Sequence, residues 1–230
     1  MPETRRHFHQ ELRDVEGRLL AMGEAARELF RESLRTFGDP SLSNAVIAGD
    51  DEVDAHWIAI EKQVVELFAL ETPVACDLRL LTALLHISLH LERVADMAVN
   101  VAKINWVTRG LPQHATVLGH LEEMGGIALE LLEAAMEAFV RRDLELARRL
   151  PSMDEPIDRL NRGMLVEVFK ASGDEAMLKW AIEMHLVSRL IERVGDHAVD
   201  IGEQVAFLVT GVFEEFSDAS HPSQGNPSQP

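Results

Sequence analysis

A short acidic pattern, Glu-Arg-Val-x-Asp, occurs twice in this chain, and this repetition restricts the possible folds more than any other feature. It occupies residues 92–96 and again residues 192–196. The surrounding segments 86–100 and 186–200 align without a gap, with Ser, Glu, Arg, Val, Asp, Ala and Val at matching positions. Such self-similarity indicates a duplicated structural unit whose two copies stack or lie side by side.

Each copy of the unit is expected to contain three helices. Apolar residues recur at intervals of three and four along six segments, which is the spacing of one helix face. These segments are residues 7–37, 42–70, 74–107, 114–141, 144–170 and 174–209. Within the fifth segment, Pro156 is expected to begin the regular helix, because proline is tolerated in a first turn but kinks a helix interior.

The chain is therefore predicted to be all-α, with two tandem three-helix bundles. We expect the first bundle at residues 1–112 and the second at residues 113–216. Residues 217–230 are rich in Ser, Gln, Asn, Pro and Gly, which predicts a disordered tail. Aromatic residues make up only 5% of the chain and Tyr is absent, so the core must be aliphatic.

Charge and cysteine content limit the partners and the compartment. The formal net charge is −17, so nucleic acid is not an expected partner, because phosphate binding needs a basic surface. One cysteine, Cys76, excludes an intrachain disulfide, and its apolar surroundings predict a buried thiol. The sequence shows no secretory signal and no apolar run long enough to span a membrane, so the expected location is the cytoplasm.

The repeated pattern forms acidic rows along two helices. Residues four apart in sequence lie on one helix face, so each row is continued by a residue one turn later. A second acidic pair precedes each row, on the preceding helix. The predicted ligands in the first half are Asp50, Asp54, Glu92, Asp96 and Asn100, and in the second half Asp154, Asp158, Glu192, Asp196 and Asp200. Asn100 in place of Asp200 makes the first site less charged.

The acidic pairs of each half are expected to face each other. Pro73 lies midway between the first two pairs, and the turn at 172–174 lies next to the midpoint of the second two. Antiparallel helices joined at these turns bring both pairs to one level, and four facing carboxylates need a cation. Oxygen ligands favour a hard cation or iron. The alternative is a solvated charged face in which Arg93 and Arg193 pair with neighbouring acids.

The histidines are expected to play no part in such a site. His86 and His90 lie well around the helix from the acidic row, which is typical of surface residues, and His197 points away from its row. No Glu is followed three residues later by His, so the Glu-x-x-His pattern of di-iron proteins is absent, which argues against a ferritin-like oxidase.

Three segments together resemble the signature of the PhoU family. Residues 73–79 read Pro-Val-Ala-Cys-Asp-Leu-Arg, and residues 91–100 read Leu-Glu-Arg-Val-Ala-Asp-Met-Ala-Val-Asn. Residues 191–201, Ile-Glu-Arg-Val-Gly-Asp-His-Ala-Val-Asp-Ile, are similar to the family's second repeat. The resemblance extends over roughly residues 7–211. Ala95 departs from it, because the family usually has the glycine that is present at Gly195.

The resemblance implies a fold of two three-helix bundles with metal clusters on the acidic rows, and a regulatory role rather than an enzymatic one. It implies a negative regulator of phosphate uptake and of the phosphate-starvation response. The implied partners are the ATPase subunit of the phosphate ABC transporter and the phosphate-sensing histidine kinase. The chain is expected to be a homodimer that meets the membrane only through partners.

The residues by themselves are compatible with several metals and with two classes of protein. Fe, Zn, Mn and Mg all accept carboxylate-rich sites in some geometry. The alternative function is a carboxylate-bridged metalloenzyme, a hydrolase or an oxidase. That alternative needs an open coordination position and a nearby acid, base or nucleophile, and the rows show no repeated group of that kind.

Overall fold

The computed structural model describes residues 3–216 and consists there of helices and turns, without a β-strand. This confirms the all-α prediction. The long helices are α1 (Glu3–Arg35), α2 (Ser43–Leu70), α3 (Ala75–Thr108), α4 (Ala115–Arg141), α5 (Leu144–Lys170) and α6 (Glu175–Thr210). Two short 3-10 turns, η1 (Pro40–Leu42) and η2 (Ala171–Gly173), precede α2 and α6. The predicted tail, residues 217–230, lies outside the described residues.

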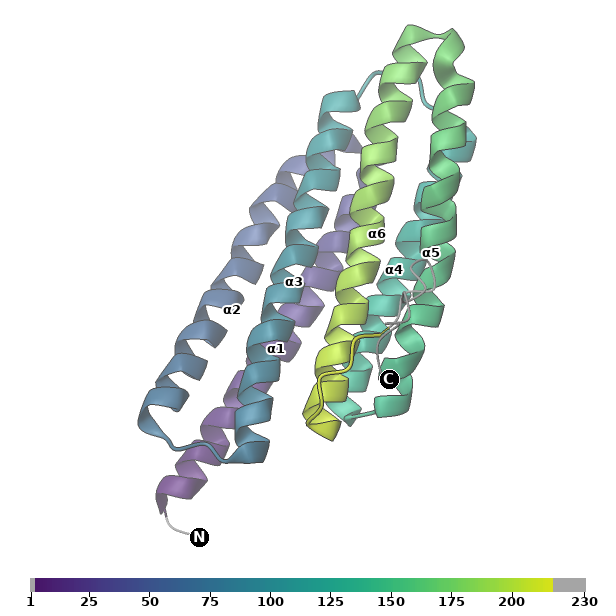
Figure 1. Cartoon of the computed structure of the whole chain (residues 1–230). Helices are drawn as coiled ribbons and strands as arrows, with labels where there is room; N and C mark the ends of the chain where they lie inside the picture. The colour runs from purple at the N-terminus through teal and green to yellow at the C-terminus, as the bar shows by residue number, and fades with distance from the viewer. Residues whose placement is uncertain (1–2, 217–230) are drawn as a thin grey trace, which may run out of the picture.

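The six helices form two tandem three-helix bundles that lie side by side. Helices α1, α2 and α3 pack together as the first bundle, and α4, α5 and α6 as the second. Helices α3 and α6 run along the centre of the molecule and pack against each other, so the two repeated segments meet there (Figure 1). Helix α1 also contacts α4, which makes a second contact between the bundles.

The central position of α3 and α6 follows from their sequences. Both helices carry buried residues on several sides, including Val94 and Ala98 on α3 and Val194 and Ala198 on α6. A helix that is apolar around most of its circumference must be surrounded by other helices. Small residues at mid-helix permit close packing, so the acidic rows beside them are held against the neighbouring helices.

Helix ends follow the local sequence. Asp174 caps α6 by accepting a hydrogen bond from the Met177 backbone N–H at 2.7 Å, as its position after the predicted turn indicates. Asp143 caps α5 in the same way through the Leu146 N–H at 3.0 Å. Helix α6 ends at Gly211, whose φ of 76° lies in the left-handed region that favours glycine.

Two expectations are wrong. Helix α5 begins at Leu144 and continues through Pro151 and Pro156, so the regular helix does not start at Pro156. Leu150 and Ile157 are fully buried on α5, and this packing holds the helix together despite the missing N–H groups. Cys76 is exposed rather than buried, because it lies in the first turn of α3, before that helix enters the core.

A helix that spans a membrane needs both sufficient length and high hydropathy. Among the helices of residues 3–216, none has an apolar stretch long enough to cross a bilayer.

Candidate metal centre

The first acidic cluster consists of Asp50 and Asp54 on α2 and Glu92 and Asp96 on α3. Burial raises the pKa of Asp50, and the negative charges of Asp54 and Asp96 raise it further. The pKa of Glu92 is raised by burial and then by Asp96, with smaller effects of Asp54 and Asp50. The four carboxylates therefore lie close enough to repel one another, as the position of the turn between α2 and α3 predicts.

Basic residues offset part of this negative charge. Arg93 lies 3.3 Å from a carboxylate oxygen of Glu92 and 3.1 Å from one of Asp96. Arg93 therefore pairs with neighbouring acids, as the alternative of a solvated charged face predicted. The pKa of Glu92 is nevertheless raised, although Arg93 lowers it. Asn100 is exposed one turn further along α3, and no hydrogen bond in the described part of the chain joins it to the other four.

The second acidic cluster consists of Asp154 and Asp158 on α5 and Glu192, Asp196 and Asp200 on α6. Asp196 is exposed to solvent, yet the atoms packed around its carboxyl group raise its pKa to about 6. The charges of Glu192, Asp158 and Asp200 add to that effect. Asp154 is buried, with 7% of its surface exposed, and Arg162 lies 3.8 Å from Asp158.

Gly195 allows the carboxylate of Asp154 to lie against the backbone of α6 in the second cluster. A Cβ atom at residue 195 would overlap Oδ1 of Asp154, so only glycine lets this carboxylate approach α6 so closely. The corresponding residue of the first half, Ala95, is fully buried, and its methyl group occupies the equivalent position on α3. The second cluster therefore has bare backbone where the first has a buried methyl group.

A pocket of about 230 Å³ opens beside the second cluster. Its lining residues are Pro151, Asp154, Asp196, Val199, Asp200, Glu203, Glu215 and Phe216. The chain after α6 folds back over it, and the Phe216 N–H donates a hydrogen bond of 2.7 Å to Glu203 Oε1. Sequence reasoning missed Glu203, although it follows Asp200 by three residues on the same helix face.

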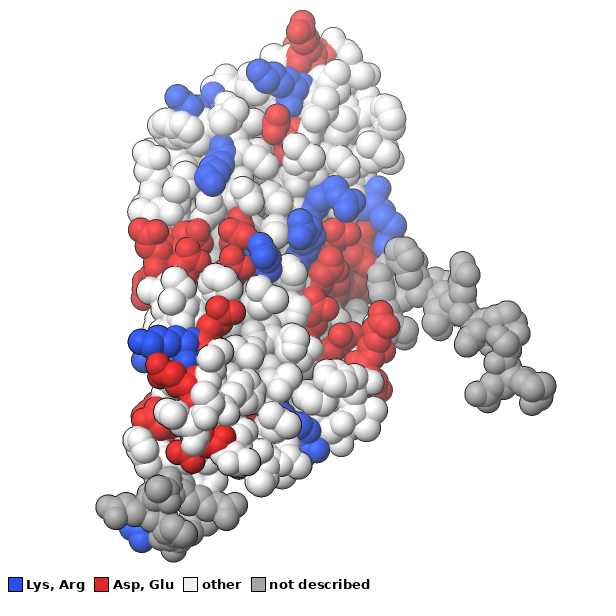
Figure 2. Space-filling view, turned by 60° about the vertical axis from the view of Figure 1, so that its left-hand side comes forward, with Lys and Arg blue, Asp and Glu red and all other residues white. Residues whose placement is uncertain are grey.

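The donor set of both clusters fits an oxygen-ligated cation. Carboxylates whose pKa values are raised by burial, and further by their mutual repulsion, gain most from a bound positive charge. Figure 2 shows Asp and Glu side chains gathered in separate groups at mid-height of one face, with Lys and Arg among them. Asp50, Asp54, Glu92 and Asp96 would hold one set of cations, and the second acidic cluster another.

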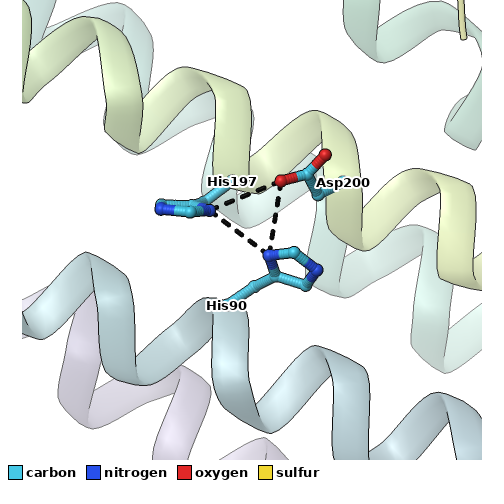
Figure 3. A group of neighbouring side chains, drawn as sticks. All are labelled: His90, His197 and Asp200. Atoms are coloured by element: carbon cyan, nitrogen blue, oxygen red, sulfur yellow. Dashed lines mark hydrogen bonds and ion pairs between the residues drawn. The ribbon is translucent and has the colours of Figure 1, made fainter.

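Two histidines form a further polar group between the bundles. His90 on α3 and His197 on α6 point toward each other, with Asp200 of α6 beside them (Figure 3). The Nδ1 atoms of the two rings are 3.3 Å apart, and each lies 3.4 Å from Oδ2 of Asp200. Burial lowers the pKa of His90 to about 4, although Asp200 opposes the shift, so this ring is neutral near pH 7.

This group corrects the expectation for His90. Its side chain is only 18% exposed, so it is not a surface residue, whereas His86 is exposed as expected. The expectation that His197 points away from the acidic row is wrong for Asp200, because its Nδ1 atom lies 3.4 Å from Oδ2 of that member of the row, and the ring also faces α3. The sequence contained no signal for this contact, because the two histidines come from different repeats and occupy different positions within them.

Comparison with known proteins agrees with the repeated architecture. A model of the PhoU domain matches the chain twice, at residues 19–104 and 121–205. A phosphate-specific transport system accessory protein PhoU homolog from Caulobacter vibrioides is 30% identical over 211 residues, which cover 90% of this chain and 92% of that protein. PhoU homolog 1 from Thermotoga maritima is 32% identical over 212 residues, with coverage of 89% and 90%.

Solved structures show the same fold. The crystal structure of PhoU from Pseudomonas aeruginosa superposes with a TM-score of 0.82 at 28% identity, and the match covers 89% of this chain and all of that one. A phosphate transport system regulatory protein PhoU from Streptococcus pneumoniae has a TM-score of 0.83 at 24% identity, with 90% and 99% coverage. With both repeats matched and relatives aligned along nearly their whole length, this chain belongs to the PhoU family.

Proposed function

We propose that this chain is a cytoplasmic negative regulator of phosphate uptake and of the phosphate-starvation response. The observation that carries the proposal is the duplicated PhoU domain, shared with relatives named as accessory proteins of a phosphate-specific transport system. We propose as its partners the ATPase subunit of the phosphate ABC transporter and the phosphate-sensing histidine kinase, and a homodimer as its assembly.

The surface chemistry supports a role in protein contacts. The formal net charge of −17 disfavours nucleic acid and favours partners with basic patches. The relatives are named accessory proteins rather than enzymes, which speaks against a carboxylate-bridged hydrolase or oxidase.

Divalent or iron ions on the two acidic clusters are the second part of the proposal. The clusters place facing carboxylates on α2 with α3 and on α5 with α6. Burial, and then the charges of the neighbouring carboxylates, raise the pKa values of Asp50, Glu92 and Asp196. Bound cations would neutralise this charge and clamp the two helices of each hairpin together. The carboxylates would bind and orient the ions, and Arg93 would balance the remaining charge of Glu92.

The regulatory role is tested by deletion. In a strain without this gene and without any paralogue of the family, we expect alkaline phosphatase activity to be high even in phosphate-rich medium. A plasmid copy of the wild-type gene should restore repression. Phosphatase activity that stays low in the deletion strain would contradict the role, and failure to co-purify the transporter ATPase would contradict the proposed partner.

The metal clusters are tested separately by elemental analysis of the purified protein. The double variant Glu92→Gln/Glu192→Gln should lose bound metal, because each cluster loses a charged ligand. The control Glu61→Gln/Glu123→Gln makes the same change in charge at exposed positions outside the clusters. Equal metal content in the two double variants would refute the assignment.

A further inference from the structure

His90, His197 and Asp200 bring three donor atoms from both bundles to one point. The distances between the atoms are 3.3, 3.4 and 3.4 Å, which is nearly an equilateral triangle. Good hydrogen bonds between such atoms are shorter, with a most common length of about 2.9 Å. Two neutral rings could each donate an Nδ1–H to Oδ2 of Asp200, but the two Nδ1 atoms would then both carry protons while standing 3.3 Å apart. Hydrogen bonding alone therefore accounts for at most two of the three contacts.

The triangle has the dimensions of one face of a tetrahedral metal site. Zinc binds imidazole nitrogen and carboxylate oxygen at about 2.05 Å, and at that bond length the ligand atoms of a tetrahedron stand about 3.35 Å apart. An ion at this distance from all three atoms would lie slightly above their plane, with a fourth position left for water. Two nitrogens and one oxygen are a donor set that zinc prefers over magnesium or calcium.

The surroundings also suit a cation. The His90 and His197 side chains are 18% and 16% exposed, whereas Asp200 is 41% exposed and leaves a path from solvent. Nε2 of His197 is buried and has no hydrogen-bond partner among residues 3–216, so Nδ1 carries the polar contacts of this ring. The second acidic cluster, which includes Asp200, adds negative potential beside the triangle.

We propose that His90, His197 and Asp200 form a zinc site that ties the first bundle to the second. The site shares Asp200 with the second acidic cluster, but it differs in chemistry because two of its three ligands are nitrogen and the ligands of the clusters are oxygen alone. It is also single, because the repeat does not duplicate it. Leu190 occupies the position equivalent to His90, and Met97 occupies the position equivalent to His197. One zinc ion per chain, between α3 and α6, would therefore lock the contact between the repeats.

The repeat supplies the variant for the test. His90→Leu/His197→Met replaces each histidine with the residue that the other half has at the equivalent position, so the packing between helices is preserved. Metal-free protein is titrated with Zn²⁺ and, in parallel, with Co²⁺, whose visible absorption is strong only in tetrahedral coordination. Wild-type protein should bind one zinc at least about 100-fold more tightly than the double variant, because two ligands are lost.

Thermal unfolding provides a second measurement. One equivalent of zinc should raise the Tm of the wild-type protein by more than that of the double variant, which keeps only the oxygen ligands of the acidic clusters. His86→Gln removes an exposed histidine one turn from His90 and should behave as wild type. Circular dichroism checks that each variant is folded.

The outcomes separate this site from the acidic clusters. Glu92→Gln/Glu192→Gln should keep the tetrahedral Co²⁺ spectrum, even where it loses other metal. The proposal is overturned if His90→Leu/His197→Met binds zinc as tightly as wild type, or if wild-type protein with Co²⁺ shows only the weak absorption of octahedral coordination. Failure of the acidic clusters to bind metal would leave the Co²⁺ result unaffected.

Discussion

The carboxylate of Asp154 on α5 lies directly against the backbone of Gly195 on α6, in the space that any side chain at residue 195 would occupy. Ile157 of α5 lies in the same contact, 3.3 Å from the position of that missing Cβ. The approach of α5 to α6, and with it the geometry of the second acidic cluster, therefore depends on one hydrogen atom in place of a methyl group. The first half of the chain has Ala95 there, with its methyl group buried.

Gly195→Ala is expected to destabilise the protein. The added methyl group must displace the buried Asp154 carboxylate, and overpacking of this kind costs about 1–3 kcal/mol. Over most of that range the cost exceeds the gain of about 0.8–1 kcal/mol from replacing glycine with alanine in a helix, which leaves a net loss of up to about 2 kcal/mol. Urea unfolding measures the difference. Ala95→Gly is the matched control and should lose the helix propensity of alanine together with the burial of its methyl group. A Gly195→Ala variant more stable than wild type would show that Asp154 is not held by this contact.

The free energy of unfolding of the metal-free protein should decrease as the pH rises from about 4 to about 6, because Asp196 loses its proton in this range. The folded-state pKa of this residue is about 6, above the ordinary value of 3.8, so the folded state binds more protons than the unfolded state in this range. The stabilisation from protonated Asp196 is fully present below about pH 4 and is lost as the pH rises through 6. Asp196→Asn should lack this contribution. Identical pH profiles for Asp196→Asn and wild type, measured by chemical unfolding with a chelator present, would contradict the raised pKa.

His90 should make the free energy of unfolding increase with pH, which is opposite to the effect of Asp196. Its folded-state pKa of about 4 lies below the ordinary value of 6.5, so the unfolded state binds more protons and stability falls as the pH decreases from 6.5 to 4. His90→Leu removes this effect and should be more stable than wild type at pH 5 by at most about 2 kcal/mol. The two proteins should differ less at pH 7.5 in metal-free buffer. A constant difference between these pH values would indicate an effect of packing instead.

Glu92→Gln should raise the Tm of the metal-free protein but reduce the increase in Tm that a divalent cation produces. Without metal, the substitution removes a charge that Asp50, Asp54 and Asp96 repel, so the Tm should rise. With saturating Mn²⁺ or Mg²⁺ the same substitution removes a ligand, so the variant should gain less from metal than wild type does. Differential scanning fluorimetry with and without cation measures both effects. Glu61 is exposed on α2 outside the cluster, so Glu61→Gln should show neither the rise in Tm without metal nor the smaller gain with metal.

Much of this architecture could be predicted from local patterns. Apolar spacing predicted six helices that the structure confirms, because burial of one face is the main force that stabilises a helix in a folded chain. The position of the turn at Pro73 also predicted that Asp50 and Asp54 face Glu92 and Asp96, because two antiparallel helices with equal rise per residue leave only one register once the turn is set. Duplication then predicted a second cluster of the same kind.

Other features depended on contacts between distant segments. Helix α5 passes through Pro151 and Pro156 because Leu150 and Ile157 are buried against neighbouring helices, and that stabilisation is invisible to local propensity. The pairing of His90 with His197 depends on how α3 packs against α6, since neither histidine has a counterpart in the other repeat. Periodicity specifies which face of a helix is buried, but the crossing of two central helices specifies which side chains meet, and only the packed tertiary structure contains that crossing.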